Sequence, residues 1–167
     1  MFIETARLEI REWTIDDFEE FAALVADPEV MRFSIKGGPW TYEEAERYFQ
    51  KLVLDQYQNG LGLWALFYKE EQKIIGLAGL ITQEIDGEKK IELGYRLFPK
   101  YWHRGLALEA AREICAYAFT VLKLKELISI IEPENTRSIR LAERVGMRPL
   151  KMTRYHKKSV YIYARAP

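Results

Sequence analysis

The sequence predicts a mixed α/β fold of the α+β class, in which helices flank a central, mostly antiparallel sheet. Residues 62–97 form three apolar segments separated by short polar turns, a pattern typical of antiparallel strands. Extended, helical and again extended segments then follow one another at residues 90–97, 105–122 and 126–131. A strand, a helix and a strand of these lengths imply a parallel pair joined by a right-handed crossover. One parallel pair among antiparallel strands makes the expected sheet a mixed one.

Length and composition favour one folded domain that spans residues 1–167. A content of 49% hydrophobic and 30% charged residues is typical of a globular chain. The sequence has no apolar run of about 18 residues, the length that a membrane-spanning helix needs. Charged residues occur too often in the first eleven positions for a secretory signal, so a cytoplasmic location is expected. The 25 basic and 25 acidic residues balance, so no overall field draws the protein to nucleic acid or to a membrane.

Cysteine and histidine usage predicts neither a disulfide nor a metal site. The single Cys115 lies in a helical segment without a basic neighbour to lower the pKa of its thiol, which favours a buried apolar role. His103 and His156 are too isolated to be metal ligands.

The first segments alternate between strand and helix. Polar and apolar residues alternate at 7–11, which predicts a half-buried strand. Thr14 with Asp17 approximates a capping box and predicts a helix that ends near Asp27-Pro28. A short second helix is expected at 29–33.

The next helix is expected from Thr41, where Glu44 completes a capping box, to Asn59-Gly60. Its expected buried stripe is Ala45, Tyr48, Phe49, Leu52 and Val53. The remaining strands are expected at 62–68, 74–83, 90–97, 126–131, 147–154 and 159–165. Asp86-Gly87 is a hairpin signal, and a last helix is expected from Asn135 to Gly146.

The junction before the helix at 105–122 carries the clearest chemical signal. The first turn of a helix leaves N–H groups unpaired, and the helix dipole adds partial positive charge, so phosphate is a natural ligand there. Gly105 lets a ligand oxygen approach the backbone closely. Lys100, His103 and Arg104 are expected to add positive charge around this junction.

The run Tyr101-Trp102-His103-Arg104-Gly105-Leu106-Ala107, followed by Glu109-Ala110, resembles the acetyl-CoA pyrophosphate loop of the GNAT superfamily of N-acetyltransferases. The resemblance is closest to the RimJ/RimL-like branch, which includes ribosomal-protein N-terminal acetyltransferases. The matching positions are Trp102, Arg104, Gly105, Ala107, Glu109 and Ala110. His103 stands where glycine is usual, and histidine tolerates unusual backbone angles better than most residues.

Residues 135–147 resemble a second GNAT segment, Asn-x-x-Ser-x-x-aliphatic followed by Gly-aromatic, in which the asparagine contacts the pantetheine and the serine faces the cofactor sulfur. Asn135 and Ser138 match, whereas Met147 replaces the usual phenylalanine. An alternative interpretation is that Asn135 serves only as a helix N-cap. The order of the predicted elements is also that of the GNAT fold, whose sheet splays between two parallel strands.

The resemblance implies a binding site for acetyl-CoA. The pantetheine arm would pair with the backbone at 95–97, and the pyrophosphate would lie on the amides of the loop. The implied cofactor-binding residues are Tyr95, Arg96, Leu97, Trp102, His103, Arg104, Gly105, Leu106, Ala107, Leu108, Asn135 and Ser138.

Glu92 is the best candidate for the catalytic base. Its side chain is expected to lie opposite Ile91 and Leu93 on the strand, and a carboxylate near an apolar wall has a raised pKa suited to accepting a proton. The alternative is a surface glutamate that pairs with a lysine of a neighbouring strand. Ser138 is the candidate proton donor to the departing thiolate, or an orienting hydroxyl.

Phe33, Trp40 and Tyr42 are candidates for an aromatic wall that recognises the acceptor, with a role in the hydrophobic core as the alternative. The resemblance thus implies an N-acetyltransferase that acts on a primary amine, either a protein N-terminus or a small molecule, by direct attack in a ternary complex. The alternative is a degenerate acyl-CoA-binding module that senses the cofactor without turnover. The expected partners are acetyl-CoA and the amine, with the chain as a monomer or homodimer.

Overall fold

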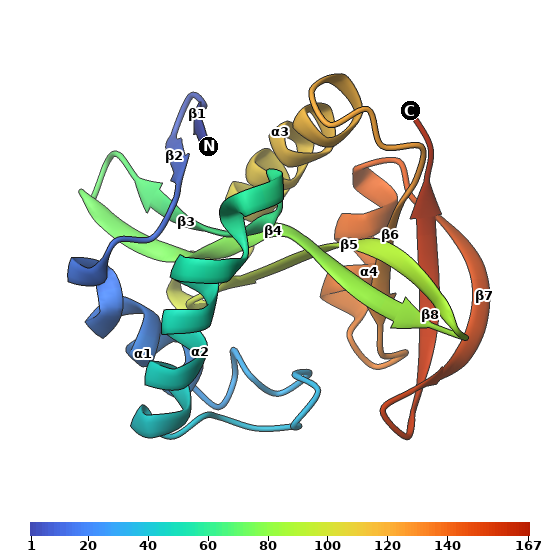
Figure 1. Ribbon diagram of the computed structural model, residues 1–167, viewed down its shortest axis with the longest axis horizontal. Coiled ribbons are helices and arrows are strands. Elements are labelled where there is room, and N and C mark those ends of the chain that lie inside the picture. The colour runs from blue at the N-terminus through green and yellow to red at the C-terminus, as the bar shows by residue number, and fades with distance from the viewer.

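The computed structural model describes residues 1–167, except for the side chains of residues 52–55 and 58. Eight strands form one sheet in the order β1-β2-β3-β4-β5-β6-β8-β7, with helices on both of its faces (Figure 1). The strands are β1 Phe2–Glu4, β2 Leu8–Arg11, β3 Gly62–Tyr68, β4 Lys73–Ile85, β5 Glu88–Leu97, β6 Leu127–Ile131, β7 Arg148–Tyr155 and β8 Lys158–Arg165. The helices are α1 Phe18–Ala26, α2 Tyr42–Asp55, α3 Leu106–Thr120 and α4 Thr136–Arg144, with short 3-10 helices at Ile15–Asp17, Tyr57–Asn59 and Pro99–Tyr101.

The two faces of the sheet have separate cores. Residues of α1 and α2 pack with Leu63, Ala65 and Leu77 of β3 and β4. On the opposite face, residues of α3 and α4 pack with Leu93 and Leu97 of β5. Because side chains alternate along a strand, each strand contributes to both layers.

The pairing of β5 with β6 is the one parallel contact among the strand pairs described, and it is very short. Its ladder aligns only Glu92 with Ile128, whereas β4 and β5 align over ten residue pairs. The edges of β5 and β6 therefore part beyond Glu92, because no ladder holds them together there. The predicted fold class, a mixed and mostly antiparallel sheet that splays between two parallel strands, is confirmed.

Most of the element predictions are confirmed, and two differ. The strand at 62–68 has the predicted bounds, and Asp86 and Gly87 form the predicted hairpin turn with φ of 50° and 81°. Strand β1 was not predicted. The helix predicted at 29–33 is wrong, because these residues form turns. The side chain of Asp27 accepts hydrogen bonds from the backbone N–H groups of Glu29 and Val30, which offers the backbone an alternative to a helix.

Helix α2 begins with the predicted capping box of Thr41 and Glu44. In its predicted buried stripe Ala45 and Phe49 are buried, but Tyr48 is 50% exposed, so that part of the prediction is wrong. The side chains of Leu52 and Val53 lie outside the described residues. Among the helices as described, none is both long and apolar enough to cross a membrane.

Candidate active site

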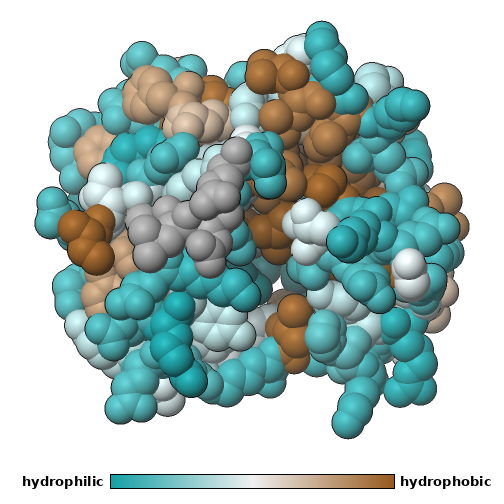
Figure 2. Space-filling view, viewed as in Figure 1, coloured by the Kyte–Doolittle hydropathy of each residue, from teal (hydrophilic) through white to brown (hydrophobic). Residues whose placement is uncertain are grey.

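A cleft of about 920 Å³ runs through the sheet where β5 and β6 part, and Figure 2 shows the surface hollowed between the half with α1 and α2 and the half with β7 and β8. Residues from both faces line it. Those on the α1–α2 side include Phe33, Trp40, Tyr48, Leu63, Ile81 and Gln83, and those on the α3–α4 side include Tyr95, Leu106, Ala107, Leu108, Asn135 and Ser138. Two ligands can therefore reach the same gap from opposite faces of the sheet.

The loop before α3 has the backbone that an anion site requires. His103 and Gly105 both adopt left-handed conformations, with φ of 60° and 76°. The first helical bond of α3 runs from the N–H of Glu109 to the carbonyl of Gly105, so the N–H groups of residues 106–108 precede it and have no partner within the helix. Residues 105–108 line the cleft, so the place where the sequence predicts a phosphate site lies at its wall.

The positive charge around this loop is smaller than the sequence predicts. The side chains of Lys100 and Arg104 both pair with Glu71, at 2.8 and 3.5 Å. Hydrogen bonds from Lys100 and Tyr101 lower the pKa of Glu71 to about 2. Arg104 also donates to the hydroxyl of Tyr68, so its side chain points away from the cleft. A nearby acid and two aromatic rings hold the Arg104 side chain there, so any contact of this residue with a ligand in the cleft would come from its backbone.

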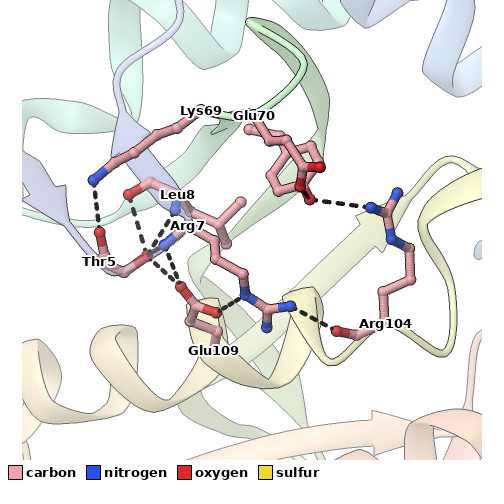
Figure 3. A network of polar contacts seen from close by, with 8 residues as sticks. Thr5, Arg7, Leu8, Lys69, Glu70, Arg104 and Glu109 are labelled. Carbon is pink, nitrogen blue, oxygen red and sulfur yellow. Dashed lines mark hydrogen bonds and ion pairs between the residues drawn. The ribbon is translucent and has the colours of Figure 1, made fainter.

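A network behind the loop fixes the start of α3 (Figure 3). The carboxylate of Glu109 accepts hydrogen bonds from the Thr5 hydroxyl and from the backbone and side chain of Arg7. Burial raises the pKa of Glu109, but these bonds outweigh it and leave the pKa lowered. Arg7 also donates to the carbonyl of Arg104 at 2.9 Å. One arginine of the β1–β2 region thus holds both the loop and the first turn of the helix.

Glu92 lies on β5 at the point where the strands part, and it lines the cleft. Burial raises the pKa of its carboxyl above the usual range, while a 2.8 Å hydrogen bond from Gln83 and the charge of Arg96 oppose the rise. The hydroxyl of Tyr155 in turn donates to Gln83 at 2.7 Å. Sequence reasoning missed Gln83 and Tyr155, which lie 72 positions apart in the chain and carry no local motif.

The edge of β5 that faces the gap begins at Leu93. The hydroxyl of Ser129 on β6 donates to the Leu93 carbonyl at 3.0 Å, which shows that this group points toward β6. Because backbone groups alternate along a strand, the N–H and C=O of Tyr95 and Leu97 point the same way. The indole of Trp102 already donates to the carbonyl of Leu97 at 2.8 Å. The backbone N–H and C=O of Tyr95 and the backbone N–H of Leu97 thus form the edge to which an extended ligand can bind.

Asn135 and Ser138 lie in the cleft at the N-terminus of α4. The side-chain oxygen of Asn135 accepts from the backbone N–H of Ser138 at 3.3 Å, so the alternative role as an N-cap is realised. The hydroxyl of Tyr95 donates to the backbone carbonyl of Ser138 at 3.2 Å, and it joins β5 to α4 across the gap.

Two of the three residues proposed for an aromatic wall lie at the cleft. Phe33 and Trp40 line the cleft, but Tyr42 does not. Tyr42 packs against Phe18 and donates to Glu19, because the first turn of α2 faces α1. Tyr48 stacks on Trp40 instead, with ring centroids 4.2 Å apart. Tyr48 lies three positions after the buried Ala45, a spacing typical of a core stripe, and this concealed its place at the cleft.

Among the residues that the structure describes, no group of three or more His, Cys, Asp and Glu side chains could hold a metal ion.

Comparison with known proteins identifies the family. The model of the acetyltransferase (GNAT) domain matches residues 7–148, which is most of the chain. The chain therefore belongs to the GNAT acetyltransferase family and is an enzyme of the N-acetyltransferase class.

Relatives and solved structures agree with this assignment. The uncharacterized N-acetyltransferase YnaD of Bacillus subtilis strain 168 is 31% identical over 148 residues, which cover 89% of this chain and 83% of YnaD. The crystal structure of a GNAT-family acetyltransferase from Bacillus anthracis has a TM-score of 0.83 and 28% identity, and the match covers 99% of this chain and 98% of that one. A spermidine N-acetyltransferase from Vibrio cholerae, solved with CoA and spermine, has a TM-score of 0.78 at 18% identity, covering 97% and 96% of the two chains, and this likeness shows the fold alone.

Proposed function

We propose that this protein transfers an acetyl group from acetyl-CoA to a primary amine by direct attack in a ternary complex. The observation that carries the proposal is the position of Glu92, at the divergence of β5 and β6 in a cleft that opens on both faces of the sheet. The amine would enter on the α1–α2 side and the cofactor on the α3–α4 side. Proximity of the two reactants then supplies a large part of the rate enhancement.

Several features fit acetyl-CoA on the α3–α4 side. Left-handed residues 103 and 105 and the free amides of residues 106–108 suit a diphosphate, and the exposed edge at Tyr95 and Leu97 suits the pantetheine amides. Bound there, acetyl-CoA supplies an activated thioester. Trp102 and Asn135 border the same part of the cleft, and Arg104 contributes through its backbone only.

Glu92 serves as the general base and accepts the proton of the amine, directly or through a water molecule. Its raised pKa brings its basicity closer to neutral pH than that of an exposed carboxylate. Gln83 and Tyr155 orient the carboxylate. Ser138 provides the proton for the departing thiolate or orients it, since it lines the cleft on the cofactor side.

We further propose, from the residues of its loop, that the chain belongs to the RimJ/RimL-like branch and that residues 1–167 act as a single domain. The protein works in the cytoplasm as a monomer or homodimer, and its acceptor is a protein N-terminus or a small amine.

The test is a panel of amines and N-terminal peptides incubated with acetyl-CoA, with thiol release as the readout. Glu92→Gln should lower kcat by about 10²- to 10⁴-fold and leave the Kd for CoA unchanged, because only proton transfer is lost. Glu113→Gln is the matched control, on the exposed surface of α3. Full turnover of every active amine by Glu92→Gln would refute the assignment of the base. CoA binding by the wild type without thiol release from any amine would favour a binding module instead.

A further inference from the structure

Arg96 is a charged residue in the cleft, and its side chain has no role in acetyl transfer as proposed above. Its backbone carbonyl lies against Gly76 of β4, so its backbone groups point away from the gap, and its side chain leaves β5 on the face opposite α3. Leu93 and Leu97 pack toward α3, so Glu92 and Arg96 alternate to the α1–α2 side. Gly94, between them, opens onto Leu63 and Ile81, which belong to that layer.

The guanidinium of Arg96 lines the cleft, and it has no hydrogen bond or ion pair with any side chain that the structure describes. Other basic side chains on this side are paired. Lys36 bonds to Glu44 at 2.6 Å, and Lys158 bonds to Glu132 at 2.6 Å. A half-buried guanidinium has lost part of its hydration, which is costly unless an acceptor replaces the water.

Glu92 and Arg96 together give this wall a negative and a positive group on one face of one strand. The positive charge of Arg96 opposes the rise that burial causes in the pKa of Glu92, and the negative charge of Glu92 opposes the fall that burial causes in the pKa of Arg96. The two side chains nevertheless do not form an ion pair. A ligand with both a positive and a negative group complements such a wall. A planar guanidinium is best satisfied by a carboxylate, which can accept two parallel hydrogen bonds. Facing this wall, Phe33 and the stacked rings of Trp40 and Tyr48 offer an apolar surface for the rest of the ligand.

We propose that Arg96 is a specificity-determining residue that binds a carboxylate of the acceptor, so that the preferred acceptor is a small amino acid with an apolar side chain. This inference rests on the proposed function and narrows its acceptor class. The amine nitrogen lies at Glu92, the carboxylate at Arg96 and the apolar side chain against Trp40 and Tyr48. Simple amines and polyamines lack the negative group and leave Arg96 unsatisfied.

The experiment compares matched pairs of acceptors, L-leucine with L-leucinamide and L-phenylalanine with L-phenylalaninamide, with spermidine as a cationic acceptor. For the wild type, kcat/KM for each acid should exceed that for its amide by at least about tenfold, since a hydrogen bond between charged groups is that strong. Arg96→Met should remove this preference through KM and leave the Kd for CoA unchanged, while the acidic limb of the pH profile moves to higher pH for acids and amides alike, because the positive charge near Glu92 is lost. Arg112→Met, on the exposed surface of α3, should behave as the wild type.

Thermal stabilisation by L-leucine in the presence of CoA gives a second readout that does not need turnover, and Arg96→Met should abolish it. Equal results for acid and amide, including no reaction and no binding of either, would overturn the inference. Loss of CoA affinity in Arg96→Met would instead make Arg96 a cofactor ligand. A shift of the pH profile that leaves the preference for the acid intact would make Arg96 only a neighbour that tunes Glu92. Either result also overturns the inference. Failure of the proposed function is distinct, because it would appear as wild-type protein that transfers acetyl to no amine at all.

Discussion

At the scale of single residues, the hydrogen bond from Gln83 to Glu92 influences the pKa of the carboxyl that we propose as the base. The bond stabilises the carboxylate and thus opposes the rise in pKa that burial causes. With Glu92 as the proposed base the charged form is the active one, so we expect activity to fall as the pH drops through the pKa of Glu92. Gln83→Leu should raise this pKa further and move the acidic limb of the kcat/KM profile to higher pH by about one unit, since a bond to a charged group contributes about 1.5 kcal/mol. Thr82→Val, exposed on the same strand, should leave the profile in place. An unmoved limb in Gln83→Leu would mean that another group titrates.

The backbone of His103 gives a second prediction at this scale. Its φ of 60° is left-handed, a region that glycine enters without the strain that a Cβ causes. His103→Gly should relieve this strain in the free and the bound protein alike, and it should lower the Kd for CoA several-fold because removal of the imidazole makes the loop amides more accessible to phosphate. Isothermal titration with CoA measures the change.

Lys123→Gly is the matched control, since Lys123 has a φ of 54° in the turn after α3 and does not line the cleft. It should change stability by less than about 1 kcal/mol and leave the Kd for CoA unaltered. Weaker CoA binding by His103→Gly would show instead that the imidazole itself contacts the cofactor.

The position of a single residue was predictable where a local sequence pattern determines it. It was not predictable where a residue distant in the sequence holds the side chain. The strand position of Glu92 and the special backbone at 103 follow from their neighbours in sequence. The positions of the Arg104 and Tyr42 side chains did not follow from the sequence, because Glu71 and Glu19, more than twenty positions away, hold them. The role of Arg7 in the loop follows from no sequence pattern, because its bonds join residues about 100 positions apart.

At the scale of elements, Arg7 couples the N-terminal strands to the first turn of α3. Arg7→Met removes the bonds to Glu109 and to the carbonyl of Arg104. We expect a loss of about 1 to 2 kcal/mol in the free energy of unfolding and a several-fold higher Kd for CoA, because the loop amides lose their fixed orientation. With saturating acetyl-CoA, kcat should be preserved. Urea denaturation and CoA titration measure the two effects.

Arg47→Met on the exposed surface of α2 is the matched control and should change neither quantity. If Arg7→Met destabilises the protein but leaves the Kd for CoA unchanged, the network supports the fold and does not organise the loop.

Element bounds were predictable because caps and turns are local. The capping box at Thr41 and the turn at Asp86-Gly87 were identified from adjacent residues and are found as predicted. The helix expected at 29–33 fails for the same kind of reason, since the side chain of Asp27 bonds locally to the backbone that a helix would need. Strand β1 was missed because it has only three residues, too few to show a periodic pattern. It is recognised as a strand only by its antiparallel pairing with β2.

At the scale of the whole molecule, the order of strands was predictable and the cleft was predictable only in part. The crossover through α3 implies the parallel pair, and the resemblance of the loop implies the splay. The shape of the acceptor side depends on residues 27–40 and on β7, which contribute Trp40 and Tyr155 from distant parts of the chain. No periodic pattern in the sequence encodes such contacts. For that reason only the structure shows that Tyr48 stacks on Trp40 and that the Arg96 side chain lies on the α1–α2 side of the cleft.

The splay also makes a prediction about how the two halves of the sheet hold together. With one aligned pair between β5 and β6, the buried hydroxyl of Ser129 supplies a further bond by donating to Leu93. Ser129→Ala leaves this carbonyl without its donor and should lower the free energy of unfolding by about 1 to 2 kcal/mol, or the Tm by about 2 to 8 °C. The gap should also lose its fixed width, so the Kd for CoA should rise. Ser159→Ala, exposed on β8, should change neither value. A destabilised Ser129→Ala that binds CoA as tightly as the wild type would show that the edge of β5 holds its geometry without β6.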